Sequence, residues 1–568
     1  MLCQRLPSFQ SPVPDIDLQS SRERIRASGS PSSLEHVQIS QIIAEAEKDL
    51  SDYEEDLRLE SIRSDLRKKR DDLQTYVDDC KAYLSPIRQL PIEIMGEIFL
   101  FYQDLHGTRK DGRFREPIND PDHSTQDLTA LMLSSVCKLW HSICLCTPQL
   151  WSRFSLDLDL DEKERDALSH LLPIYLSRSK QMSLCFDIKI QGDPPAPTKS
   201  LSLLVAQSHR WFSTTWVYDD DMVEETVACL GVQKELPLLQ HIAVKPIDDY
   251  VCSGDLLSAF ARACTPRTVS LTWMSNFLDL KLPWSEVHFL RAREVDIATG
   301  VPEFLAKLAG QCHALRSFEV HFSDNVLYKS AQLECSIHLD ALEYLCLDAV
   351  SWSELGEFFS ISTLPNLRRL ALDTVSVHND THTPNIDSFR SFVSRSQCQI
   401  SVLQLRPLRF DAALDPICDM IHHLPALKKL ILAEKWTHPG AIMLSLMETL
   451  HVCSSHSIEA GQGADSLTTQ HNDPVLPLLE ELVMEVRAEG FQASNFVDMV
   501  KSRRSLTGHG IRALKSVRLY LQWSYSTTDF TVPPILQSLE CTDIDIISSM
   551  HDSRRFLRDE HQECWPAP

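Results

Sequence analysis

The sequence predicts a mixed α+β repeat protein, in which a long N-terminal helix and a small helical module precede an irregular α/β solenoid. Three observations support this fold class. Residues 41–83 contain neither proline nor glycine, and their apolar residues recur at spacings of three and four. Two further apolar stripes at helical spacing follow within residues 84–154. Beyond about residue 200, a unit of the form apolar-x-x-apolar-x-apolar recurs about ten times.

Length and composition favour a folded chain with several domains' worth of residues. The chain has 568 residues, of which 43% are hydrophobic and 24% charged, as in an average globular protein. Residues 1–38 mix serine, proline and arginine without periodicity, so we expect a disordered tail there. Residues 551–568 are predicted to form a C-terminal tail.

The sequence argues against secretion, membrane insertion and nucleic-acid binding. The chain has no apolar run of about 18 residues and no secretory signal pattern, so we expect an intracellular protein, cytoplasmic or nuclear, without membrane contact. Its 17 cysteines lack paired spacing and are expected to be reduced and mostly buried. A formal net charge of −24 argues against nucleic acid as the main partner.

The segment 39–83 is predicted to be a long charged helix. Its apolar stripe changes phase between Leu57 and Leu59, which weakens the prediction of one continuous coiled coil. Two interpretations therefore stay open: an exposed helix that packs locally, or a coiled coil through which residues 41–83 form a homo-oligomer.

The most informative stretch lies within residues 84–154. Pro91 precedes an apolar stripe, where a proline is tolerated in the first helical turn. A polar segment at about 103–126 separates this helix from a second amphipathic helix, which ends at the sequence TPQLW. Two such helices form a small module with apolar surface left for a partner.

This stretch resembles the F-box, the adaptor-binding module of Skp–cullin–F-box ubiquitin ligases. The resemblance rests on LPIEIMGEIF at 90–99 and VCKLWHSICLCTPQLW at 136–151, and the whole arrangement is similar to F-box proteins of mushroom-forming fungi. The polar segment is longer than the turn of the typical module. The resemblance and the apolar spacing together predict an adaptor interface and its support, formed by Leu90, Pro91, Ile94, Ile98, Phe99, Val136, Trp140, Ile143, Leu150 and Trp151.

The repeated units occupy residues 201–550, and 155–200 is interpreted as a linker. Most units follow one another after about 23 to 35 residues, and several begin with a proline turn, as in LPNLRRLAL and LPALKKLIL. Each apolar-x-apolar ending predicts a short strand whose alternate side chains enter the core. The array resembles the irregular leucine-rich-repeat region that follows the F-box in many such proteins.

No sequence fragment supports an enzyme, a cofactor or a metal site. The sequence HNDTH at 378–382 lacks the glutamate that a zinc protease needs, and it follows a predicted repeat strand where a polar loop is expected. GHGIRA at 508–513 matches a relaxed dinucleotide fingerprint but lacks a buried strand before it. We therefore expect a protein that binds other proteins and carries out no catalysis itself.

The resemblance implies a substrate receptor that binds a Skp-type adaptor through the helical module and an unknown target through the repeats. The alternative is a scaffold outside any ligase that self-associates through residues 41–83. The net charge favours basic partner segments. Two pairs of adjacent cations lie beside predicted strands: Arg368 and Arg369, and Lys428 and Lys429. One cation of each pair is expected on the concave side of the solenoid, where it could make the local surface charge positive.

Overall fold

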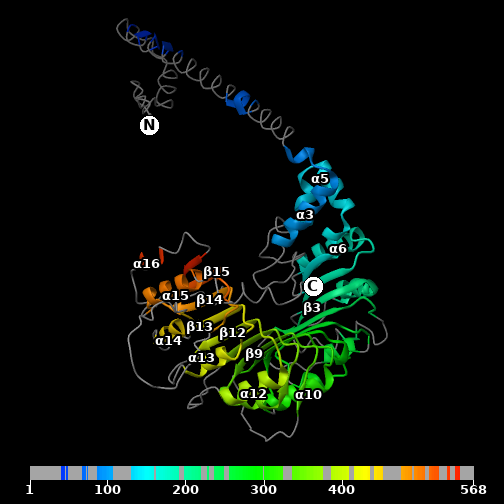
Figure 1. Ribbon diagram of the computed structural model, residues 1–568. Coiled ribbons are helices and arrows are strands. Elements are labelled where there is room, and N and C mark those ends of the chain that lie inside the picture. Colours follow the sequence, from blue (N-terminus) through cyan, green and yellow to red (C-terminus); the bar gives the residue numbers. More distant parts are fainter. Residues whose placement is uncertain are drawn as a thin grey trace, which may run out of the picture. The chain divides into compact units, whose positions relative to one another are not determined.

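The computed structural model shows strands and helices in alternation from residue 153 onward (Figure 1). It describes residues 37, 40, 41, 43, 44, 47, 48, 51, 67–71, 73, 86–106, 129–158, 162–190, 198–218, 227–228, 236–247, 255–261, 263–274, 276–297, 300–323, 336–374, 385–408, 415–434, 441–451, 475–488, 491–505, 511–522, 534–537 and 544–549. The predicted tails and the predicted helix at 39–83 lie almost wholly outside these residues, and so does most of the predicted polar insertion.

The chain forms two compact units, Met1–Ile94 and Met95–Pro568. The described part of the first unit includes the 3-10 helix η1 (Pro86–Gln89) and the first turn of α3 (Ile92–His106), the helix in which the boundary falls. The second unit holds the elements that follow α3.

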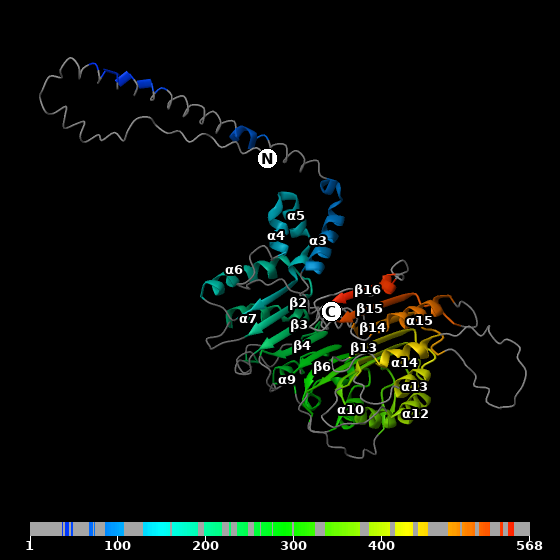
Figure 2. The same cartoon turned by 90° about the vertical axis from the view of Figure 1, so that its left-hand side faces the viewer.

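One parallel sheet of 14 strands organises the second unit (Figure 2). Its strands lie side by side in chain order, and parallel pairing requires a crossover connection between neighbours. The strands are β1 (Arg153–Asp157), β2 (Leu184–Ile190), β3 (Trp211–Tyr218), β4 (His241–Pro246), β5 (Thr268–Thr272), β6 (Phe289–Val295), β7 (Ser317–Phe322), β9 (Tyr344–Val350), β11 (Arg369–Thr374), β12 (Val402–Leu408), β13 (Lys429–Glu434), β14 (Glu481–Arg487), β15 (Ser516–Gln522) and β16 (Ile544–Ser549). A separate parallel pair joins β8 (Ile337–His338) to β10 (Ser362–Thr363). This mixed α/β architecture with one large parallel sheet is compatible with a repeat solenoid.

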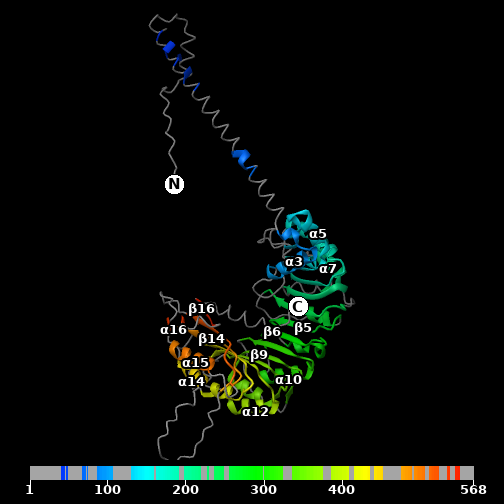
Figure 3. The ribbon, with the colours of Figure 1, turned by 45° about the horizontal axis from the view of Figure 1, so that its top comes forward.

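Helices occur before the sheet and in its crossovers. They are α4 (Thr129–Val136), α5 (Lys138–Cys146), η3 (Pro148–Trp151), α6 (Glu162–Arg178), α7 (Thr198–Ala206), η4 (Ser208–Arg210), α9 (Asp255–Ala261), η6 (Phe277–Asp279), η7 (Trp284–Glu286), α10 (Val301–Gln311), α11 (Trp352–Ile361), α12 (Ile386–Ser396), α13 (Asp415–His422), α14 (Ala441–Leu450), α15 (Ala493–Ser505) and α16 (Pro534–Gln537). Figure 3 shows α10, α12, α14 and α15 together on one side of the strands. Among the described residues, no helix is both long and apolar enough to cross a membrane.

Two rows of apolar side chains, here called ladders, run across neighbouring strands and pack the sheet against these helices. On β11 the ladders are formed by Leu370 and Leu372, which pair in register with Leu403 and Leu405 on β12. All four are buried and belong to the same core as Phe392 of α12. Because side chains alternate along a strand, two residues of each unit point to the helices and the residues between them point to the opposite face. That opposite face is called the strand face below.

Residues 155–200 are not a linker, so this prediction is wrong. They contain most of β1, all of α6 and β2, and the start of α7. Phe186 and Ile188 on β2 pair with Phe154 and Leu156 on β1, and they extend the two apolar ladders to the first strand. These strands lack the leading leucine of the repeat unit and use aromatic residues in the ladder, which hid them from the repeat search.

Two buried arginines, Arg210 and Arg503, and the exposed Arg395 connect neighbouring crossovers. Arg210, Arg395 and Arg503 each donate hydrogen bonds to backbone carbonyl oxygens that lie between 27 and 53 residues away along the chain. A backbone carbonyl in a crossover has no partner in the sheet, so a buried guanidinium with its five N–H groups can satisfy several at once.

Candidate functional site

The helical module has a buried apolar support that the sequence predicted in part. Phe99 of α3 is buried and its ring centroid lies 4.8 Å from that of Trp140 on α5, which is half-buried. Trp151 is fully buried in η3, where its indole N–H donates to the carbonyl of Cys144 at 2.9 Å. The predicted residues Ile143 and Leu150 are buried as well. These buried side chains belong to the same hydrophobic core as the sheet, so the module packs onto the start of the repeat array.

Close approach of backbone also shapes this module. A Cβ atom at Gly96 of α3 would lie 3.3 Å from the hydroxyl oxygen of Thr147, closer than nearly all real contacts of that kind. Gln103, seven residues later on the same helix, is buried and donates to the carbonyl of Leu150 at 3.1 Å. Helix α3 continues to His106, so residues 103–106 belong to it and not to the predicted polar insertion.

Other apolar side chains of the module point to solvent. In the second unit, Ile98 is 39% exposed on α3 and Val136 is 56% exposed at the end of α4. In the first unit, the predicted residues Leu90, Pro91 and Ile94 are also exposed. The predicted interface residues thus divide into a buried set that supports the module and an exposed set available to a partner.

Several exposed apolar residues were absent from the predicted interface, among them Phe101 on α3 and Leu139 and Leu145 on α5. Phe101 follows Ile98 by three residues, so helical spacing alone could have found it. Leu139 and Leu145 lie outside the LPxEI and TPxLW patterns, which drew attention to their neighbours. In the second unit, exposed apolar side chains thus accompany α3, α4 and α5.

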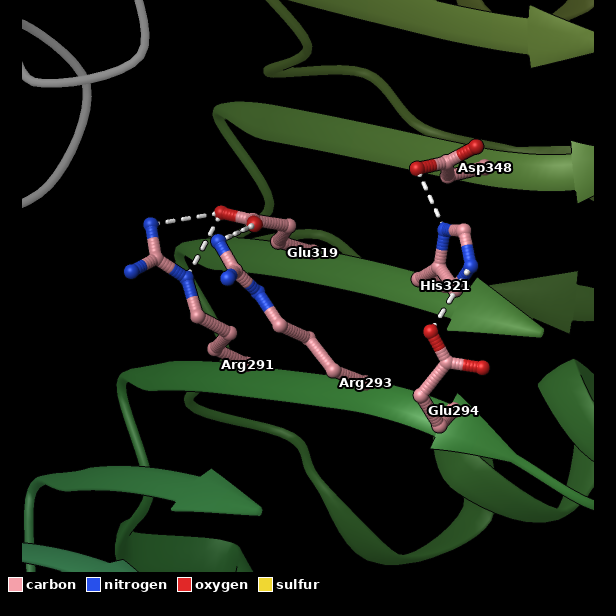
Figure 4. Close-up of polar contacts among 6 residues, drawn as sticks. All are labelled: Arg291, Arg293, Glu294, Glu319, His321 and Asp348. Atoms are coloured by element: carbon pink, nitrogen blue, oxygen red, sulfur yellow. Dashed lines mark hydrogen bonds and ion pairs between the residues drawn. The ribbon is translucent and has the colours of Figure 1, made fainter. Parts of the chain in front are cut away.

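A second candidate site lies on the strand face of β6, β7 and β9 (Figure 4). Arg291 of β6 forms an ion pair of 2.7 Å with Glu319 of β7, and Arg293 contacts the same carboxylate at 3.3 Å. His321, also on β7, lies with its Nδ1 2.5 Å from Asp348 Oδ2 on β9. Charges of opposite sign therefore alternate between neighbouring strands, which stabilises the pairing across the sheet.

A bulge in β6 completes this cluster. The pairing of β6 with β7 shifts between Ala292 and Val295, and Glu294 adopts a left-handed conformation with φ of 52°. The extra residue returns Val295 to the buried ladder and leaves Glu294 on the strand face. There its Oε1 lies 3.3 Å from Nε2 of His321, so the imidazole stands between two carboxylates (Figure 4).

The electrostatics of the strand face follow from these contacts. Burial alone would lower the pKa of His321, but the hydrogen bond to Asp348 and the charges of Asp348, Glu294 and Asp373 raise it above its usual value. On β14, burial raises the pKa of Glu485 to about 7, although the charge of Arg406 opposes the shift. Glu485 therefore changes charge close to neutral pH, and His321 keeps its proton to a higher pH than an ordinary histidine does.

The four predicted cations take two different positions. Arg369 and Lys429 are the first residues of β11 and β13, and the strand alternation places both on the strand face. Arg368 and Lys428 precede the strands and are exposed. Lys429 Nζ lies 3.5 Å from Glu481 Oε2, so its charge is partly offset by a neighbouring strand.

Substitution of His321 by glutamine should destabilise the fold more at pH 5.5 than at pH 8.5. A histidine whose pKa is raised by folding contributes stability below the pKa of the unfolded chain, about 6.5, and loses that contribution as the pH rises through the folded value. Because a third of the side chain is exposed, we expect a difference below about 1 kcal/mol in urea unfolding at the two pH values.

The matched control for that experiment is His313→Gln, at an exposed position of the same unit. An equal loss of stability for His321→Gln at both pH values would show that its carboxylate partners do not favour the protonated ring.

No described group of side chains has the composition of a metal centre. Within the described ranges, no three or more histidine, cysteine, aspartate or glutamate residues are placed to hold an ion together. The sequence HNDTH at 378–382 lies outside those ranges.

Comparisons with known proteins identify no family for this chain. No protein-family model matches it, and no curated protein matches it. Among solved structures, a crystal structure of a Bacteroides fragilis protein from the Northeast Structural Genomics Consortium is similar at 14% identity. The match covers 70% of this chain and 75% of that chain, with a TM-score of 0.20.

Proposed function

We propose that this chain is the substrate-recognition subunit of a Skp–cullin–F-box type ubiquitin ligase. The observation that carries the proposal is the division of the F-box-like residues into two sets. Phe99, Ile143, Leu150 and Trp151 form the buried support, while apolar neighbours such as Ile98 remain exposed. Exposed apolar side chains grouped on a small helical module are typical of a protein-binding surface.

The repeat array suits the second half of this role. In this proposal the strand–helix units of the second unit are degenerate leucine-rich repeats, because their strands share ladders of apolar residues and many of their crossovers contain a helix. The strand face of such an array carries side chains that vary from unit to unit, including the cluster in Figure 4. That face would hold the target protein.

The chemistry would then belong to other subunits. A receptor contributes by holding its target close to a charged ubiquitin-conjugating enzyme, which raises the effective concentration of the reacting groups. No residue of this chain is assigned a catalytic role.

Copurification with a Skp-type adaptor tests the proposal. Each apolar side chain buried in an interface contributes about 1.5–3 kcal/mol, so Ile98→Asp combined with Val136→Asp should cost at least about 3 kcal/mol and weaken binding by about 100-fold or more. Because both residues are exposed in the free chain, its circular-dichroism spectrum should not change. The double substitution Leu90→Ala, Pro91→Ala in the first unit should likewise reduce copurification.

The control is Leu238→Asp, an exposed apolar residue in the connection between β3 and β4 of the repeat array. It should leave adaptor binding unchanged. Absence of adaptor binding by the parent chain would reject the ligase function and favour the scaffold that self-associates through residues 41–83.

A further inference from the structure

The bulge in β6 places two consecutive residues of opposite charge, Arg293 and Glu294, on the strand face (Figure 4). In a regular strand, successive side chains point to opposite faces, so one member of such a pair would point toward the helices. Here Arg293 contacts Glu319 of β7, and Glu294 contacts His321, two residues farther along the same strand. The bulge therefore creates a cationic site and an anionic site next to each other.

The cationic site is centred on Arg293, which keeps most of its hydrogen-bond donors for another anion. Its Nη2 contacts Glu319 at 3.3 Å, but Arg291 already holds that carboxylate at the shorter distance of 2.7 Å. The side chain of Arg293 is 53% exposed, against 22% for Arg291. A guanidinium group has five N–H donors in a planar fork that matches a carboxylate. An acidic side chain of a partner can therefore pair with Arg293 without displacing Arg291.

The anionic site consists of Glu294 and Asp348, with His321 between them. The imidazole lies 3.3 Å from Glu294 and 2.5 Å from Asp348, and it carries at most one positive charge against two carboxylates. About a third of each of these three side chains is exposed. A negative charge therefore remains on this site even when the ring is protonated, and it favours a basic side chain from a partner.

The spacing of the two sites matches that of an extended chain. Glu319 and His321 mark the two sites on β7, and two residues of a parallel strand span about 6.6 Å. An extended segment that lies lengthwise over β6 and β7 presents every second side chain to the sheet at this same interval. Side chains on one face of a helix are closer together, at about 5–6 Å.

We propose that the strand face of β6, β7 and β9 binds an extended protein segment in which an acidic and a basic residue are two positions apart. The acidic residue pairs with Arg293, and the basic residue pairs with Glu294 and Asp348. This inference rests on the proposed function, because it describes the segment of the target that the strand face would hold. The net charge of the chain alone favours basic partners, whereas this part of the surface selects both signs.

Selection from a display library of random linear peptides tests the proposal, with the full chain as the immobilised protein. We expect the bound peptides to be enriched in an acidic and a basic residue with one residue between them. Arg293→Glu should remove the preference for the acidic residue and retain that for the basic one, and Glu294→Lys should do the reverse. Because both side chains are partly exposed, the circular-dichroism spectrum should not change.

The charge-matched controls are Lys281→Glu and Glu286→Lys, at exposed positions in the connection between β5 and β6. These substitutions change the net charge by the same amounts, but at positions outside the strands. They should leave the enrichment unaltered.

A double-mutant cycle with one selected peptide assigns the individual contacts. Arg293→Gln should weaken binding of that peptide about two- to fivefold, as expected for an exposed charge pair, and so should replacement of the peptide's acidic residue by its amide. The two changes together should weaken binding no more than either alone, because they remove the same contact. The basic residue of the peptide and Glu294→Gln should behave in the same way.

Two results would overturn the proposal. Selected peptides that lack the paired charges, or that keep both preferences in Arg293→Glu and Glu294→Lys, would show that another surface selects them. Charges spaced three or four residues apart would show that the segment binds as a helix. Adaptor binding plays no part in these measurements, so failure of this inference is distinguishable from failure of the proposed function.

Discussion

Substitution of Arg503 by methionine should lower the free energy of unfolding by about 3 kcal/mol or more. Arg503 is fully buried and donates to the carbonyl oxygens of Leu450, at 2.6 Å, and Leu476, at 2.8 Å, and to that of Val475. Methionine fills similar space but leaves these buried acceptors without donors, at a cost of about 1–3 kcal/mol each. Burial lowers the pKa of Arg503 to about 10, which shows that burying the charge itself is unfavourable and offsets part of the loss.

Urea unfolding of the full chain measures this effect, with two comparison variants. Arg503→Lys keeps the charge but cannot reach three carbonyls at once, so its stability should be intermediate. Arg504→Met removes a single exposed contact with the carbonyl of Lys515 at 3.3 Å and should cost less than about 1 kcal/mol. Equal losses for Arg503→Met and Arg504→Met would show that the three carbonyls find other partners.

The repeat periodicity predicted much of the core because it reports the strand alternation directly. In LPNLRRLAL the residues Leu367, Leu370 and Leu372 are all buried, as the apolar-x-x-apolar-x-apolar unit requires. The same pattern predicted one cation of the pair Arg368, Arg369 on the strand face, and in the structure this is Arg369, which directly precedes the ladder residue Leu370. Local alternation is enough for these assignments, and no long-range contact enters them.

Features that depend on contacts between units were not predictable from the sequence. The sequence around Glu294 does not predict a bulge. Glu294, which adopts the left-handed conformation, is not a glycine, and the register shift depends on the pairing with β7. Arg503 looks like one more charged residue at the end of α15, and its carbonyl partners lie between 27 and 53 residues away.

The division of the helical module into interface and support residues was predicted from the F-box motif more than from the spacing of its apolar residues. Helical spacing indicates which residues of α3 share a face, but it does not say which face is buried. Met95 and Phe99 are buried while Ile98 is exposed, so one helix carries apolar residues on both sides. A single sequence cannot distinguish a core stripe from a binding stripe when both are apolar.

Substitution of Leu370 by aspartate should cost about 3 kcal/mol or more and should weaken the neighbouring units as well. Leu370 is 1% exposed in the apolar ladder between Leu345 on β9 and Leu403 on β12, so the new carboxylate would be buried without a partner. In a sheet whose strands pair in chain order, each unit contacts mainly its neighbours, so amide exchange should accelerate most in β9, β11 and β12 and less toward either end. Arg368→Asp, at the exposed position two residues earlier, is the control and should change stability by less than about 0.5 kcal/mol. If the two variants were equally stable, or if exchange accelerated uniformly along the sheet, the ladder would not be the element that holds the units together.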